Sequence, residues 1–358
     1  MTKFSRRLIL KTAILALIPS YFKSFAENIK SYILVLTSAP DDNYGKSHQF
    51  VITPPGTINI FNLDTKKINT INIDFFGHVV SSYKNQPHLA VTFEQFGSRG
   101  ALINLKTFKI LKTVRSDKTN TFMGHSYYIV SKNWLLTTEH NHLKNQGEIV
   151  IRDPQTLKVI KTISSGGSYP HDIHFSNQGE RIIVANAGKP SNLSFIDPEN
   201  NKILKKILIA EGKKGAFSHF EVSKDEWILV GPRKRGNPPI IISPHGTQHQ
   251  LPEPKSKKKG VLSILFIKNT DFVAATFPEA NFLQIWDYKR QVVVKSFPLK
   301  NPRGLIMDTF NENESTFLVT SADDSTLSKV TIKQNEILLS KYEFKYGGKG
   351  AHISKILI

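Results

Sequence analysis

The sequence predicts an all-β fold, a seven-bladed β-propeller closed by pairing of the N- and C-terminal strands in one blade. First, four histidines recur at intervals of 47, 46 and 48 residues, and each opens a short apolar strand pattern: His78, His125, His171 and His219. Second, each copy continues with alternating apolar runs joined by turns rich in Asp, Pro and Asn, which is typical of hairpins. Third, residues 27–358 show no long amphipathic helix pattern, which disfavours α/β folds. Eight blades or a pair of sandwiches stay open as alternatives.

Six copies of the repeat follow one another along the chain. Four strands per copy fit the segments 78–115, 124–163, 170–209, 218–251, 261–298 and 303–345. The pattern is clear in the second copy, where the runs 148–152 and 158–163 flank the turn residues Asp153 and Pro154. An Asp at this position can bond the backbone two residues on, which favours the turn.

A seventh copy is split between the two ends of the chain. Its outer three strands are expected at 31–36, 57–61 and 67–71, and its innermost strand at 351–358. Pairing these segments in one sheet closes the ring and removes the long unpaired edges of an open stack. Residues 27–358 are therefore predicted to form a single domain, which suits the size of a seven-bladed ring.

The first 26 residues have the layout of an export signal. The arginine pair Arg6-Arg7 precedes an apolar run that ends at the small residues around Ala26. This order is typical of signal peptides, and the consecutive arginines resemble the twin-arginine type. We therefore expect export to the periplasm by the twin-arginine pathway, with no transmembrane span in the mature chain. An ordinary Sec signal or an uncleaved N-terminal anchor is the alternative.

Composition restricts the chemistry and the partners. The chain has no cysteine, which excludes disulfides, thiolate metal ligands and a cysteine nucleophile. Its formal charge is +19, with basic clusters at 233–235 and 255–259. Such clusters can attract nucleic acid, anionic lipid or acidic proteins. For an exported protein we expect no nucleic acid partner, and we interpret the clusters as solvated loops, with weak attraction to a membrane surface as the second reading.

Two sets of polar residues are expected to meet at one mouth of the central channel, because innermost strands begin there and the loops between second and third strands open there. The first set comes from the innermost strands: His78, His125, His171, His219, Arg303 and His352. The second set comes from the loops: Glu94, Glu139, His140, His142, Asn186, Arg233, Glu279, Asp41, Asp42, Asp323 and Asp324. Together they predict a ligand-binding mouth, represented best by the first set with Glu139, His140 and Asn186.

The chemistry of the predicted mouth favours a transition metal. We expect His125, His171 and Glu139 to be the ligands, because neutral imidazoles with a carboxylate suit iron, copper or zinc. Arg303 would hold an anionic co-ligand bidentately, and Asp172 could orient an imidazole through its second nitrogen. Binding should then weaken below about pH 6.5. The alternative is structural bracing, as in WD-repeat propellers, where a Gly-His pair bonds a turn aspartate.

Five segments carry a resemblance to a known family: 123–126, 135–139, 147–153, 169–173 and 183–188. They resemble a bacterial exported family of unknown function with a YVTN/quinoprotein-like propeller. His140 stands where that family usually has Asn, and the Gly-rich continuation after the second Ala-Asn motif is missing. The resemblance implies a propeller fold, a twin-arginine signal and genes near periplasmic iron-uptake components.

These observations predict a periplasmic binding or assembly protein rather than an enzyme, with a monomeric ring that holds iron or another metal at its mouth. A periplasmic iron-uptake protein is the expected partner. Two other functions stay open. One is an enzyme like lactonases or quinoprotein dehydrogenases, which use the same mouth on similar propellers. The other is a protein-interaction scaffold without a small ligand.

Overall fold

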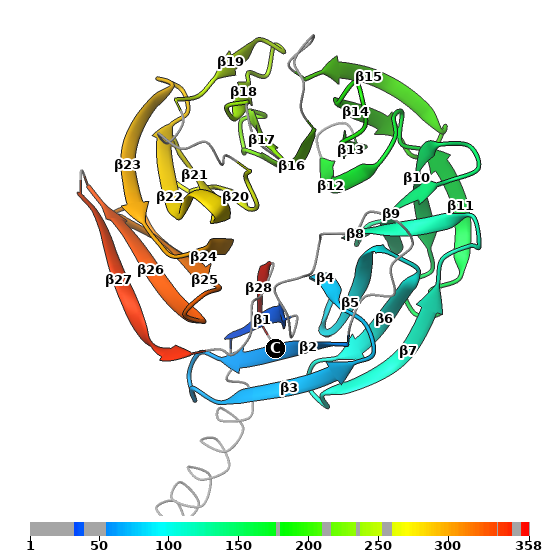
Figure 1. Ribbon diagram of the computed structural model, residues 1–358, viewed down its shortest axis with the longest axis horizontal. Helices are drawn as coiled ribbons and strands as arrows, with labels where there is room; N and C mark the ends of the chain where they lie inside the picture. The colour runs from blue at the N-terminus through cyan, green and yellow to red at the C-terminus, as the bar shows by residue number, and fades with distance from the viewer. Residues whose placement is uncertain are drawn as a thin grey trace, which may run out of the picture.

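The computed structural model describes residues 32–38, 55–176, 180–209, 216–233, 237–252, 260–334, 336–345 and 352–357. Its strands are arranged radially in a ring around a central axis (Figure 1). The all-β propeller predicted from the sequence is therefore confirmed. The predicted signal at 1–26 and the basic cluster at 255–259 lie outside the described residues.

Five of the sheets are separate and have four strands each. One combines β28 (Ile353–Leu357), β1 (Tyr32–Ser38), β2 (Gly56–Asn62) and β3 (Ile68–Ile73). The next two are β12 (Pro170–Ser176), β13 (Arg181–Asn186), β14 (Asn192–Asp197) and β15 (Lys202–Leu208), then β16 (Phe217–Val222), β17 (Ile228–Pro232), β18 (Ile240–Ile242) and β19 (Gln248–Gln250). The last two are β20 (Ile264–Phe266), β21 (Phe272–Phe277), β22 (Phe282–Asp287) and β23 (Val292–Pro298), then β24 (Pro302–Phe310), β25 (Glu314–Ser321), β26 (Thr326–Lys333) and β27 (Glu336–Lys345).

The remaining described strands form one eight-stranded sheet. It contains β4 (Gly77–Tyr83), β5 (Gln86–Gly97), β6 (Arg99–Asn104), β7 (Lys109–Arg115), β8 (Asn120–Ile129), β9 (Trp134–Asn141), β10 (Gln146–Arg152) and β11 (Val159–Ser164). The prediction of seven separate blades is therefore wrong: five are separate, and two predicted copies are continuous. The cause is the long strand β5, which pairs with β4 and β6 and then continues, so that Gln95 pairs with Met123 and Gly97 with Phe122 of β8.

The two ends of the chain meet in one sheet. Strand β1 pairs antiparallel with β28, in a register that joins Val35 to Ser354, and with β2 on its other side. The buried side chains of Leu34 and Ile353 pack in the same cluster. The expected closure of the ring by the N- and C-terminal strands is therefore confirmed.

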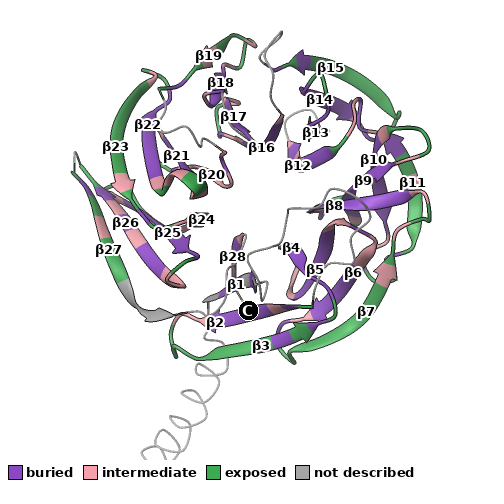
Figure 2. Ribbon diagram, viewed as in Figure 1, coloured by how far each residue is buried: buried purple, intermediate pink, exposed green. Residues whose placement is uncertain are grey.

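Burial follows the distance of each strand from the axis. The outermost strands are mostly exposed, and the strands inside them are mostly buried (Figure 2). Apolar clusters lie between neighbouring sheets: Val35 and Ile60 of one sheet pack with Val80 and Ile103 of the next. Adjacent blades are thus held together by burial of apolar surface.

The described residues contain one short 3₁₀ helix, Pro278–Ala280. They hold no helix with the length and hydropathy that a bilayer crossing requires.

Candidate metal centre

Five histidines from five neighbouring elements gather at the axis. They are carried by β4, β8, β12 and β16 and by the residue that precedes β28: His78, His125, His171, His219 and His352. Ring centroids lie 4.6 Å apart for His171 and His219, and 4.8 Å for His78 and His352. His125 lies within 5.6 Å of the other four. The sequence-predicted histidines are therefore all brought together.

Irregular strand pairing aims these side chains at the axis. The pairing register shifts beside the histidine in four of the strands, between Gly77 and Val80, Phe122 and Ser126, Pro170 and Asp172, and Phe217 and His219. Bulges of this kind redirect a side chain that strict alternation would place elsewhere. The repeat of the bulge from strand to strand explains why one register of the sequence meets at one point.

Threonine hydroxyls hold the backbone of the cluster. Thr37 donates to the carbonyl oxygen of His78, at 3.2 Å. Thr138 lies within 3.2 Å of the carbonyl oxygens of both His125 and His171. This role is not predicted above, although a Thr recurs on the second strand of several copies and is the signal that the sequence offers.

The lack of a side chain at Gly124 leaves room for the imidazole of His78. Gly124 has φ +98°, and a Cβ built there would lie 2.7 Å from Cδ2 of His78. A larger residue would therefore meet both backbone strain and the imidazole.

Burial keeps the imidazoles of His78, His171, His219 and His352 neutral. It lowers the pKa of His78, His171 and His352 well below 6.5, and the neighbouring histidines lower it further. Burial, followed by His125, lowers the pKa of His219 to about 3. Neutral imidazoles offer lone pairs, which are what a metal ion requires.

A carboxylate from the neighbouring sheet holds one imidazole in place. Oδ1 of Asp172 lies 3.0 Å from Nδ1 of His125. Burial alone would raise the pKa of Asp172, but His125, together with His219 and the backbone N–H of Phe220, outweighs burial and the pKa falls to about 2. Sequence analysis expected Asp172 to orient an imidazole, and its partner is the histidine of the preceding copy. A metal-binding histidine characteristically makes this bond through its second nitrogen.

Several ring nitrogens point into the cluster without a protein partner. Among the described residues, both nitrogens of His78 and Nε2 of His125 and His352 are buried and make no hydrogen bond. Leaving buried polar atoms unpaired costs free energy. Two sets of three histidines have ligand atoms within 4.8 Å of one another: His78, His125 and His352, and His125, His171 and His219. The arrangement can therefore hold a transition-metal ion.

Two arginines add positive charge near the cluster. Arg303 is the second residue of β24, and its carbonyl oxygen accepts a hydrogen bond from Thr276 at 2.7 Å. Its charge contributes to the lowered pKa of His352. Arg233, which directly follows β17, acts in the same way on His78, His171 and His219. A bound anion would be stabilised here.

The end of the long strand β5 also contacts the histidine cluster and Arg233. Nε2 of Gln95 lies 3.4 Å from Nδ1 of His171. The guanidinium of Arg233 lies 4.9 Å from the ring centroid of Phe96, which has φ +64°. The sequence does not indicate this contact of Gln95, because its pattern predicts a loop at Glu94 and the residues that follow.

Glu139 is not brought into the histidine cluster. Its carboxylate is buried and lies 2.6 Å from Nη2 of Arg152, with further bonds from Thr137 and Asn120. It belongs to neither of the close ligand groups found among the described residues. Strand alternation is the reason: Thr138 faces the histidine backbone, so its neighbour Glu139 faces the other way. Glu139 is therefore replaced by a third histidine in the candidate centre.

His140 and Asn186 lie in other polar networks. His140 stacks on Tyr169 at 4.0 Å, and its ring lies 4.9 Å from His142. Burial lowers the pKa of His140 to about 4. Asn186 is buried and donates to Asn192 at 3.0 Å and to the carbonyl of Ser165 at 2.9 Å.

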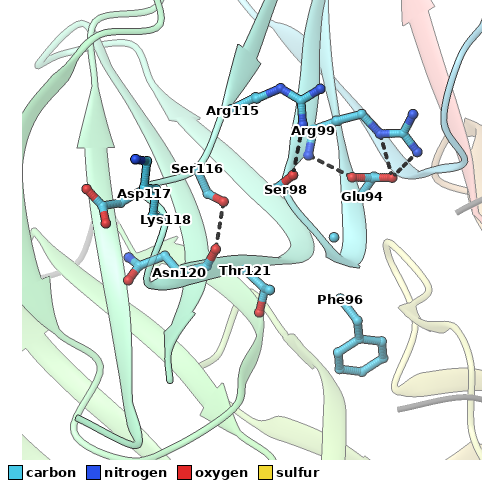
Figure 3. Close-up of a pocket in the computed structure, with 11 residues that line it drawn as sticks. Glu94, Phe96, Ser98, Arg99, Arg115, Ser116, Asp117, Lys118, Asn120 and Thr121 are labelled. Carbon is cyan, nitrogen blue, oxygen red and sulfur yellow. Dashed lines mark hydrogen bonds and ion pairs between the residues drawn. The ribbon is translucent and has the colours of Figure 1, made fainter. Parts of the chain in front are cut away.

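A surface cavity of about 460 Å³ lies beside Phe96. In Figure 3, Arg99 is held by the carboxylate of Glu94, and Arg115 reaches the hydroxyl of Ser98. Glu94 is thereby neutralised by Arg99, at 2.7 Å. The predicted loop residue Glu94 therefore supports this cavity wall and is absent from the close ligand groups.

Solved structures share this fold at low sequence identity. A Bacteroides fragilis protein named provisionally as a 6-phosphogluconolactonase is 13% identical, with a TM-score of 0.64 over 92% of this chain and 98% of that chain. AztD from Citrobacter koseri is 11% identical, with a TM-score of 0.54 over 92% and 98%. Hydrazine synthase from Kuenenia stuttgartiensis is 10% identical, with a TM-score of 0.59 over 80% and 90%. Such identities support likeness of fold alone. No curated protein sequence matches the chain.

Family membership rests on the sequence itself. The profile of a family described as a protein of unknown function, DUF1513, matches residues 72–341. This span includes His78, His125, His171, His219 and Arg303. It covers well over half of the 358 residues. The chain therefore belongs to the DUF1513 family.

Proposed function

We propose that this protein binds a transition-metal ion at the axial histidine cluster and acts as a binding or assembly protein. The observation that carries the proposal is the unpaired Nε2 of His125 beside unpaired nitrogens of His78 and His352, two imidazoles whose pKa burial holds well below 6.5. The bond from His125 to Asp172 supports it, because it fixes the ring with Nε2 aimed at the cluster.

The donor set favours iron, copper or zinc. Imidazole nitrogen suits these ions, whereas magnesium and calcium prefer oxygen. Arg303 and Arg233 favour an anionic co-ligand, because a divalent ion bound by neutral imidazoles adds to their positive charge. A link to iron uptake, with a periplasmic iron-uptake protein as partner, is part of the proposal and rests on the family resemblance.

The proposed compartment is the periplasm, reached by the twin-arginine pathway. It rests on Arg6-Arg7 and the apolar run that follows. Replacing both arginines by lysine should leave precursor in the cytoplasm, as measured by fractionation and by processing near Ala26. Normal periplasmic accumulation of this variant would contradict the twin-arginine route.

Metal binding is tested with untagged protein. We expect elemental analysis to find a metal in the purified chain, and calorimetric titration with ferrous, cupric and zinc ions to show binding. The variant with both His125→Ala and His171→Ala should lose binding and still melt cooperatively, whereas exposed His245→Ala should behave like the unaltered chain.

Two outcomes would overturn the proposal. If the folded unaltered protein binds none of the three ions and carries none, the simple-ion function is wrong, and a scaffold or a chelated ligand takes its place. If the double variant loses its fold while no metal is lost, the histidines serve structural bracing instead.

A further inference from the structure

The histidine cluster contains two overlapping sets of three ligands. His78, His125 and His352 form the first triad, and His125, His171 and His219 form the second. In each triad the candidate ligand atoms lie within 4.8 Å of one another, and His125 belongs to both. Zinc sites with three protein ligands, as in catalytic zinc centres, keep a fourth tetrahedral position open.

The shared histidine can serve only one triad at a time. Nδ1 of His125 lies 3.0 Å from the carboxylate of Asp172, so this nitrogen carries the proton that Asp172 accepts. The single lone pair left for a metal is on Nε2, which is buried and has no hydrogen-bond partner among the described residues. An ion in one triad therefore excludes an equally coordinated ion in the other.

The two triads differ in what an ion must displace. In the first triad, the nitrogens of His78 and Nε2 of His352 are unpaired within the described chain, so no hydrogen bond is lost on binding. In the second, Nε2 of His171 lies 3.3 Å from Nε2 of His219, and one proton is shared between them. An ion between these atoms requires that proton to move to the Nδ1 of the same ring, and the hydrogen bond breaks.

We propose that the cluster offers a single divalent transition-metal ion two alternative three-histidine positions that share His125, with the triad of His78 and His352 preferred. This inference rests on the proposed function. The ion would move between the positions by exchanging two imidazoles while His125 stays bound. Such an exchange lets a buried ion change position within the cluster without a step in which all its protein ligands are lost.

The test uses zinc and cobalt ions and three variants of the full chain. Zinc affinity and stoichiometry are measured by competition with a chromophoric chelator, and the cobalt visible spectrum reports the ligand set. His→Gln changes keep side-chain volume and polarity: one variant alters His78 and His352, one alters His171 and His219, and one alters His125. His245→Gln is the control, because His245 is exposed.

We expect one zinc per unaltered chain. Changing His171 and His219 should weaken zinc binding by about tenfold or less, and changing His78 and His352 by about 100-fold with an altered cobalt spectrum, since each leaves one triad. Changing His125 should cost more than about 1,000-fold, because both triads are lost. Two zinc ions per unaltered chain, or abolished binding in both pair variants, would overturn the inference.

A second measurement does not depend on the folding of any variant. Anomalous diffraction from crystals of the unaltered chain grown with zinc should show a peak bounded by His78, His125 and His352. A peak bounded by four or five histidines would overturn the two-position inference and leave the proposed function standing. Absence of ferrous, cupric and zinc binding by the unaltered chain in solution would defeat the proposed function itself.

Discussion

The imidazole of His125 is fixed by a carboxylate that comes from a different sheet. Asp172 follows His171 in the sequence, yet its Oδ1 lies 3.0 Å from His125. The same carboxylate accepts hydrogen bonds from the backbone N–H groups of Ile173 and Phe220. One side chain thus joins three neighbouring innermost strands at the candidate centre.

Replacing Asp172 by Asn should weaken zinc binding by about 10- to 100-fold, the usual cost of losing such an outer partner. The amide removes the negative charge that holds Nδ1–H of His125, but its oxygen can still accept the backbone bond from Ile173, so the fold should persist. Chelator competition measures the affinity, and Asp197→Asn in an exposed turn is the control. An affinity equal to that of the unaltered chain would show that Asp172 does not orient a ligand.

The metal-free protein should lose stability as pH falls below about 6.5. Burial lowers the folded pKa of His78, His171 and His352, and that of His219 to about 3, so the unfolded chain binds more protons in this range. Urea unfolding from pH 8 to pH 4 measures the slope, which should be smaller in His219→Gln.

The effect of Glu221 on the pH dependence of stability is opposite to that of the histidines. Burial, with the charge of Asp172, raises the pKa of Glu221 to about 8, so its contribution to stability falls as pH rises from its usual value of 4.5 to 8. The comparison with His219→Gln isolates the histidine contribution; equal slopes in the two proteins would contradict it. Zinc binding by His78 and His352 should persist below pH 6.5, the value expected from free imidazole, since protons compete for these two imidazoles only near their lowered pKa values.

At the scale of the strand, neighbouring side chains of β9 have two different roles, one at the histidine cluster and one inside the blade. Thr138 holds the backbone of His125 and His171, and Glu139 on the opposite face is buried against Arg152 at 2.6 Å. Asn120 also donates to Glu139 at 3.1 Å. The alternation of side chains along a strand therefore separates support of the candidate metal centre from the ionic bond inside the blade.

Glu139→Gln should destabilise the protein by about 3–5 kcal/mol, because it leaves the buried guanidinium of Arg152 without its counter-charge. Zinc affinity of the folded variant should match that of the unaltered chain. Thermal melts and zinc titration measure the two properties. Glu180→Gln, which removes an exposed partner of Lys132, is the control and should cost less than about 1 kcal/mol. A selective loss of zinc binding would return Glu139 to the ligand set.

At the scale of the whole molecule, closure depends on one short strand. Strand β28 pairs with β1 and buries Ile353 and Ile356 against the neighbouring sheets. Lys355 from the same strand lies 2.7 Å from the carboxylate of Asp308 on β24. The last strand thus ties the first sheet of the ring to the last.

Removing residues 353–358 should cause aggregation or a large fall in melting temperature, since β1 is left as an unpaired edge and apolar surface is exposed. His352 is retained, so the loss does not come from the histidine itself. Size-exclusion chromatography and thermal melts measure the effect, with Lys355→Ala as a control that keeps the strand. A truncated chain that stays monomeric and melts like the full chain would contradict closure by β28.

The sequence by itself determined the all-β ring, its closure by the two ends and the meeting of His78, His125, His171, His219 and His352. These features follow from a local repeat, because equal spacing places each histidine at the same point of a similar hairpin unit. Tertiary structure decided the rest. Pairing of Gln95 with Met123, which merges two blades, depends on contacts between copies rather than on a pattern within one.

For the candidate ligands too, part of the arrangement follows from the sequence and part is decided by the tertiary structure. Asp172 bonds the histidine of another copy, and Glu139 turns away because alternation along β9 faces it toward Arg152. Sequence spacing indicates which residues reach one end of the channel. The choice of partners there depends on bulges and on packing between blades, which bring together atoms that lie far apart in the chain.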